Sequence, residues 1–126
     1  MDNYVVWLDS KDAHIFSLKT TGIEKKHLQK SENDHHRTSK KDMHKDKNAE
    51  PYYHHLAETL KEADQVLLMG PGLAKNHFKD YLDTHEANTL AKKIIGLETL
   101  EKMTENQIMA AARKFFKHYD LFNNPI

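Results

Sequence analysis

Two short runs of apolar and β-branched residues open the chain, with four polar residues between them. The runs are residues 4–8 (YVVWL) and 13–18 (AHIFSL), and residues 9–12 (DSKD) separate them. Strand-forming runs joined by such turn formers predict a β-hairpin. Residues 23–29 alternate loosely between apolar and charged side chains, which predicts a third, solvated strand. The chain is therefore expected to begin with an antiparallel meander.

Helices and strands are expected to alternate after this meander. The predicted helices cover residues 50–63, about 73–85 and 104–119, and the predicted strands cover residues 65–69 (QVLLM) and 92–97 (KKIIGL). Thr104 and Gln107 have the spacing of a capping box at the start of the last helix. A strand-helix-strand step favours a parallel crossover. We therefore predict an α/β fold of three layers, in which helices flank a mixed five-stranded sheet.

Each predicted helix has an apolar stripe that should face the sheet. In the first helix Tyr53 is expected on the buried side. The complete stripes are, in chain order, Tyr53, Leu56, Ala57, Leu60 and Ala63; Ala74, Phe78, Tyr81 and Leu82; and Ile108, Ala112, Phe115 and Tyr119.

Length and composition narrow the classes of protein that the chain can belong to. A chain of 126 residues falls in the size range of one domain, so residues 1–126 are expected to form a single unit. The absence of cysteine excludes disulfides, thiolate metal sites and thiol catalysis. The first apolar run is too short for a signal peptide or a membrane span, which predicts a cytoplasmic protein without membrane contact.

Residues 31–48 are almost devoid of apolar side chains, with Met43 as the exception. Such a segment cannot bury enough surface to offset the entropy lost on ordering. It is predicted to be a long exposed loop. Loops of this length in small domains are either functional or disordered, so this one is the first candidate for binding.

The opening hairpin, the loop after the third strand, the tyrosine-bearing helix, and the sequences QVLLMGPGLAKNHFKDYL and KKIIGLE form a recognisable combination. It resembles the central domain of the archaeal and eukaryotic class-1 peptide-chain release factor and of its rescue relative Pelota. The GPGxxK step is its most specific mark. The resemblance spans nearly the whole chain and implies a ribonuclease-H-like fold of the translational machinery.

The loop of that release factor carries a Gly-Gly-Gln motif that promotes peptidyl-tRNA hydrolysis on the ribosome. Residues 35–47 contain neither Gly nor Gln, and Pelota also lacks the motif. The resemblance therefore implies a stand-alone bacterial module without peptide-release activity, catalytic residues or cofactors. Its expected partner is the ribosome or ribosomal RNA.

Several loop side chains are suited to contacts with RNA phosphates. The predicted RNA-binding residues are His35, His36, Arg37, Lys40, Lys41, Lys45 and Lys47. A solvated loop without a ligand is an equally weighted alternative. Gly70, Gly72 and Lys75 form a second candidate, a phosphate-binding turn before a helix, although a structural turn is the favoured interpretation.

Three other interpretations remain open. The histidine pairs at residues 35–36 and 54–55 are weak candidates for metal ligation, and no metal site is predicted. Asp9, Asp12 and Glu58 are the carboxylates available for a metal-dependent nuclease, the main enzymatic alternative. A protein-interaction domain or homodimer that has kept only the fold is the third.

Overall fold

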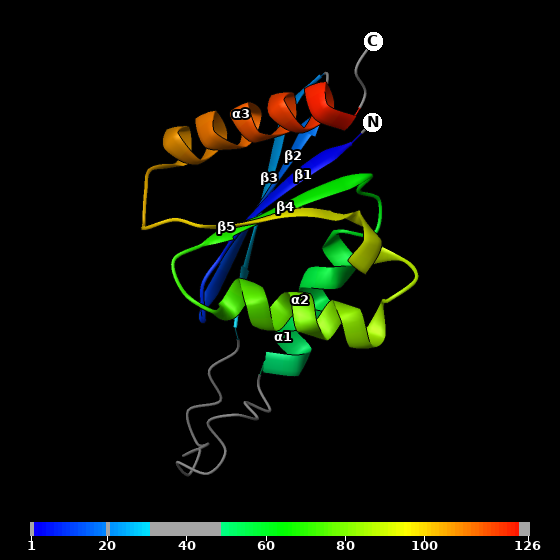
Figure 1. Ribbon diagram of the computed structural model, residues 1–126. Helices are drawn as coiled ribbons and strands as arrows, with labels where there is room; N and C mark the ends of the chain where they lie inside the picture. The colour runs from blue at the N-terminus through cyan, green and yellow to red at the C-terminus, as the bar shows by residue number, and fades with distance from the viewer. Residues whose placement is uncertain (1, 20, 31–48, 124–126) are drawn as a thin grey trace.

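The computed structural model describes residues 2–19, 21–30 and 49–123, apart from the side chains of residues 49 and 121–123. A five-stranded sheet forms its centre (Figure 1), with the strand order β3-β2-β1-β4-β5. The strands are β1 (Asn3–Leu8), β2 (Asp12–Lys19), β3 (Gly22–Gln29), β4 (Gln65–Gly70) and β5 (Ile94–Thr99).

The sheet is mixed, as the sequence predicts. β1 pairs with β2, and β2 with β3, in antiparallel fashion, while β4 runs parallel to both β1 and β5. The first strand of the chain is therefore the central strand of the sheet. Its residues point alternately to the two faces, and all five from Tyr4 to Leu8 are buried.

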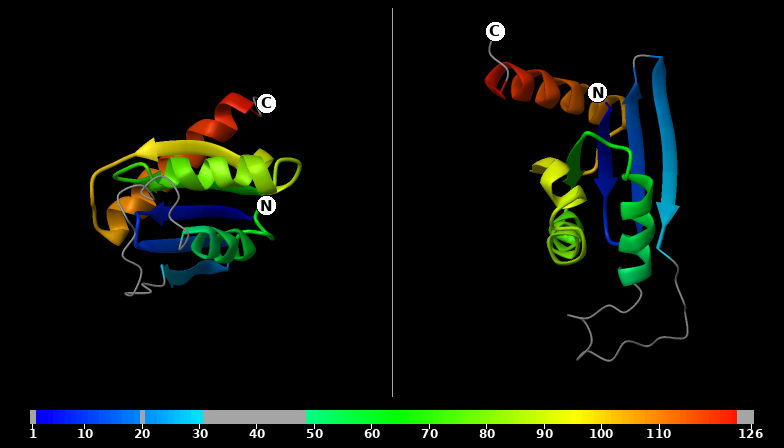
Figure 2. Two further views of the ribbon diagram at one scale, coloured as in Figure 1. Left: turned by 90° about the horizontal axis from the view of Figure 1, so that it is seen from below. Right: turned by 90° about the vertical axis from the view of Figure 1, so that its right-hand side faces the viewer.

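Three helices cover the two faces of the sheet. These are α1 (Ala49–Thr59), α2 (Ala74–His85) and α3 (Glu105–Asn123). The first two lie on one face and α3 lies on the other, so the predicted three layers are confirmed (Figure 2). Within the part of the chain that the structure describes, no helix combines the length and apolar character needed to cross a membrane.

Each face of the sheet carries its own apolar core. Val6 and Leu8 of β1 belong to the core under α1 and α2, together with Leu56, Leu68 and Phe78. Val5 and Trp7 of the same strand belong to the core under α3. Since burial of apolar surface is the main driving force of folding, both helix layers are required to cover the sheet.

Two predicted helix stripes are wrong in detail. Tyr52, which is 4% exposed, takes the buried side of α1, and Tyr53 is only partly buried. In α3, Met109 and Phe116 are buried, whereas Phe115 packs at the margin of the core. The other predicted positions of the first stripe, Leu56, Ala57, Leu60 and Ala63, are buried, as are Ile108 and Ala112 of the last one. Both predicted faces are therefore right, and only individual aromatic residues differ.

The last strand begins two residues later than predicted. A short 3-10 helix, η2 (Leu90–Lys93), occupies the start of the predicted range and buries Leu90 and Ala91. The strand then runs over Ile94–Thr99. An irregularity between Val66 and Leu67 of β4 shifts the register of the pairing with β5.

The capping box predicted for α3 is confirmed. The backbone N–H of Gln107 donates to the Thr104 hydroxyl oxygen at 3.2 Å. In return, the backbone N–H of Thr104 donates to the Gln107 side-chain oxygen at 2.9 Å. These reciprocal bonds satisfy two backbone donors that a helix start otherwise leaves without partners.

Gly70 allows β4 to pass very close to β1. A Cβ atom at this position would lie 2.0 Å from the carbonyl oxygen of Leu8. No side chain fits at that distance, so the first glycine of the GPG step has a structural role. The chain then turns through Pro71 and Gly72 into α2.

Candidate functional site

The segments on either side of residues 31–48 converge on the β1–β2 turn. At the end of β3, the backbone N–H of Lys30 donates to the carbonyl oxygen of Lys11 at 2.7 Å. At the start of α1, the Tyr52 hydroxyl group donates to the carbonyl oxygen of Asp9 at 3.3 Å. The turn therefore holds both the end of β3 and the first turn of α1.

The predicted RNA-binding residues themselves lie outside the described residues. They are His35, His36, Arg37, Lys40, Lys41, Lys45 and Lys47, all within residues 31–48. Their role in binding stays a prediction.

The β1–β2 turn owes its shape to Asp9. One oxygen of its carboxylate accepts the backbone N–H groups of Lys11 and Asp12, at 2.8 and 2.7 Å. This is the local hydrogen bonding for which Asp is favoured in turns. Burial, and after it the charge of Asp9 and Asp12, raises the pKa of the Tyr52 hydroxyl, so this group remains a hydrogen-bond donor to a higher pH than an exposed tyrosine does.

A stacked pair of histidines lies next to this turn and was missed by the sequence reasoning. The rings of His14 and His27, on neighbouring strands, are stacked with centroids 4.5 Å apart. The Nε2 atom of His27 lies 2.7 Å from a carboxylate oxygen of Asp12. The sequence does not reveal the register in which β2 and β3 pair. Only the observed pairing, which places His14 opposite His27, shows that the two residues meet.

The two lysines of β3 do not form one patch. Successive side chains of a strand point to opposite faces, so Lys25 and Lys26 are directed to different sides of the sheet. The ammonium group of Lys25 lies 2.7 Å from the carboxylate of Glu105 at the start of α3. Lys26 is exposed on the side of α1 and α2.

The lysine that follows the GPG turn, Lys75, is buried and bonds to the turn itself. Lys75 is only 1% exposed, and its ammonium group donates to the carbonyl oxygen of Gly72. A cation buried in this way needs a partner, and the turn supplies one. The phosphate-binding role of Gly70, Gly72 and Lys75 stays a prediction, and the contacts agree with the structural interpretation.

The carboxylates considered for a nuclease each have local partners. Asp9 shapes the turn and Asp12 pairs with His27, while Glu58 lies 3.5 Å from His54 and 3.4 Å from Lys61. Among the described residues, no group of three or more His, Asp or Glu side chains is arranged to hold a metal ion. Nuclease activity therefore stays an alternative interpretation, and the expectation of no metal site at His54 and His55 stays a prediction.

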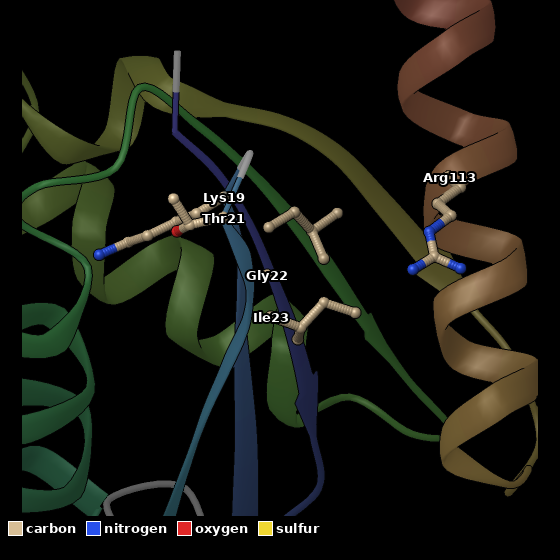
Figure 3. Close-up of a pocket in the computed structure, with 6 residues that line it drawn as sticks. Lys19, Thr21, Gly22, Ile23 and Arg113 are labelled. Atoms are coloured by element: carbon tan, nitrogen blue, oxygen red, sulfur yellow. The ribbon is translucent and has the colours of Figure 1, made fainter.

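A hollow of about 400 Å³ lies between α3 and the turn that joins β2 to β3 (Figure 3). Leu18 and Ile23 supply its apolar lining, and Arg113 lies across from Ile23 on α3. The ammonium group of Lys19 instead pairs with Glu24 at 3.3 Å, and this hydrogen bond raises the pKa of Lys19. Thr21 and Gly22 complete the lining.

Comparison with known proteins identifies relatives of this fold. No protein-family model matches the chain. A Pelota homologue from Methanocaldococcus jannaschii is 29% identical over 110 residues, which are 83% of this chain and 30% of that protein.

Solved structures show the same fold. The Archaeoglobus fulgidus Pelota structure superposes with a TM-score of 0.63 at 16% identity, covering 90% of this chain and 31% of that one. The archaeal termination factor aRF1 superposes with a TM-score of 0.55 at 19% identity, covering 95% of this chain and 40% of that one. Saccharomyces cerevisiae Dom34 is described as a translation termination-like factor in RNA quality control that interacts with Hbs1. Its structure superposes with a TM-score of 0.61 at 12% identity, covering 97% of this chain and 35% of that one.

The chain is thus homologous, in sequence and structure, to part of Pelota, and its fold is that of the corresponding part of aRF1. It spans about a third of the length of the relatives that it matches. The resemblance inferred from the hairpin, the tyrosine-bearing helix and the GPG step is confirmed.

Proposed function

We propose that this chain, as a homologue of part of Pelota, is a translation-associated module that binds the ribosome through ribosomal RNA and does not catalyse peptide release. The observation that carries the proposal is the sequence match to a Pelota homologue over 83% of the chain. The likeness to Dom34 and aRF1 in fold is consistent with it.

The chemistry of residues 31–48 supports the non-enzymatic part of the proposal. Residues 35–47 contain four lysines and one arginine but neither glycine nor glutamine. Without paired glycines the backbone lacks the freedom that a tight catalytic loop requires. Cationic side chains, by contrast, are what affinity for a phosphate backbone needs.

The geometry of the β1–β2 turn supports a role for this segment as the contact surface. Lys30 and Tyr52, which lie before and after residues 31–48 in the sequence, are both hydrogen-bonded to the same turn at one end of the sheet. A rigid body that presents a binding segment from fixed ends is the usual arrangement of functional loops.

Co-sedimentation with ribosomes at several salt concentrations tests the proposal. The wild-type chain should pellet with ribosomes at low salt and should be released as salt rises. The triple variant Arg37→Ala, Lys40→Ala and Lys41→Ala should bind at least about tenfold more weakly, and its salt slope should fall by about 3, roughly one for each lost phosphate contact.

The matched control removes three exposed cations elsewhere. The variant Lys61→Ala, Lys92→Ala and Lys102→Ala has the same net charge as the triple loop variant, so it reports the effect of total charge alone. Binding should stay close to that of the wild type. A wild-type chain that never pellets with ribosomes would refute the proposed function, and equal losses in both triple variants would refute the role of the loop.

A further inference from the structure

The hollow between α3 and the β2–β3 turn has an unpaired cation on one side and an exposed apolar side chain on the other. Ile23 is 40% exposed, which makes it one of the few large apolar side chains at the surface of the described residues. Arg113 faces it from α3. Within the described part of the chain, the Arg113 guanidinium group has neither an ion pair nor a hydrogen bond.

The stretch of α3 around Arg113 contains basic residues but no acidic ones. Between Asn106 and Tyr119 the helix contains Arg113, Lys114, Lys117 and His118 but no Asp or Glu. Residues four apart lie on the same side of a helix, so Lys117 continues the side on which Arg113 stands. Because the whole chain has a formal net charge of zero, this stretch is a local concentration of positive charge.

We infer that this hollow binds one nucleotide of RNA, with a backbone phosphate on Arg113 and the ribose or base against Leu18 and Ile23. The guanidinium group is suited to a phosphate because its donors match the phosphate oxygens in a planar, two-bond geometry. The volume of about 400 Å³ is within the range of small-ligand sites.

The inference rests on the proposed function and adds a second contact on the opposite face of the sheet from α1 and α2. Lys19 does not take part through its ammonium group, since that group is paired with Glu24 and turned away from Arg113 (Figure 3). Lys117 supplies the next cation for an adjoining phosphate. A strand of RNA would then follow α3 past the β2–β3 turn.

Fluorescence anisotropy with a short labelled oligouridine tests the site. The variant Arg113→Glu should bind about tenfold more weakly, because it loses a hydrogen-bonded charge contact. The matched control is Lys114→Glu, which makes the same charge change one residue further along the same helix. Consecutive helical residues point about 100° apart, so Lys114 does not face the hollow, and the control should lose less than about threefold.

A second pair of variants tests the apolar wall. Ile23→Ala should weaken binding by about threefold through lost apolar contact. The control Leu97→Ala removes a leucine of similar exposure, 37%, from the opposite edge of the sheet, and it should leave binding unchanged. In NMR titrations, the amide signals of residues 21–23 should shift on addition of the oligonucleotide.

The outcomes separate the site from the proposed function. Equal losses in Arg113→Glu and Lys114→Glu, or amide shifts that avoid residues 21–23, would overturn the site while ribosome binding stands. A wild-type chain that binds neither oligouridine nor ribosomes would overturn both.

Discussion

Tyr52 joins α1 to the β1–β2 turn through its hydroxyl group, which donates to the carbonyl oxygen of Asp9. Its ring is buried in the core under α1, and burial raises its pKa above the ordinary value. The folded chain therefore holds this proton more tightly than the unfolded chain, in which tyrosine ionises near pH 10. The stability of the folded chain therefore depends on whether the Tyr52 hydroxyl group is protonated.

Alkaline unfolding should reveal this connection. The stabilisation linked to Tyr52 is complete below about pH 10 and is lost as pH rises further, because the unfolded chain then releases the proton. Tyr52→Phe should be about 1 kcal/mol less stable at neutral pH through the lost hydrogen bond. It should also lose less stability than the wild type above about pH 10. Urea unfolding at a series of pH values measures both, and identical pH profiles would contradict the assignment.

The first and second glycines of the GPG step should respond differently to substitution. Gly70→Ala places a methyl group against the Leu8 carbonyl oxygen and should cost about 3 kcal/mol of unfolding free energy. Gly72→Ala is the matched control, since a Cβ atom there has no neighbour within 4 Å. Thermal unfolding of the two variants compares them directly. Equal melting temperatures would show that β1 and β4 do not approach each other so closely.

At the level of single elements, the start of α3 is fixed by two side chains that bond each other's backbone. Thr104→Ala should destabilise the fold by about 1 kcal/mol, because a backbone donor loses its partner. Gln107→Ala removes the other half of the box. The double variant should lose less than the sum of the single losses if the two bonds support each other. Urea unfolding of the three variants gives the coupling, and strict additivity would contradict it.

Element types and their order could be predicted from sequence because each depends on local patterns. The Asp9 turn, the alternation in β3 and the Thr104–Gln107 box all act within a few residues. Which aromatic residue of a helix is buried, by contrast, does not depend on local patterns alone. Tyr52 and Tyr53 both fit a helical stripe that includes Leu56, and only the position of the sheet decides between them. The sequence pattern therefore predicts the buried face of the helix but not which of two neighbouring tyrosines it includes.

The candidate sites were harder to predict because their parts come together only in the folded chain. The His14–His27 stack depends on the register of β2 and β3. The hollow combines Ile23 with Arg113, ninety residues further along the chain. Burial of Lys75 was equally hidden, because lysine is almost never fully buried without a partner and the Gly72 carbonyl oxygen is a partner that composition does not reveal.

For the molecule as a whole, ten histidines in a chain with balanced formal charge predict a pH-dependent affinity for RNA. Histidine gains positive charge between about pH 8 and about pH 5, so the net charge becomes positive as pH falls. Ribosome binding at fixed salt should therefore strengthen several-fold from about pH 7.5 to about pH 6. Co-sedimentation at the two pH values measures the change. Weaker binding at the lower pH would contradict an electrostatic contact with RNA.

The central place of β1 has a consequence for synthesis of the chain. β1 is made first, yet it receives its parallel neighbour only after residue 70 has emerged, and Trp7 is covered only after α3 has followed. Until α3 (Glu105–Asn123) has been made, the growing chain would therefore expose an incomplete sheet and the Trp7 side chain. Pairings so distant in sequence slow folding, and chains at this stage should depend on chaperones until α3 has left the exit tunnel.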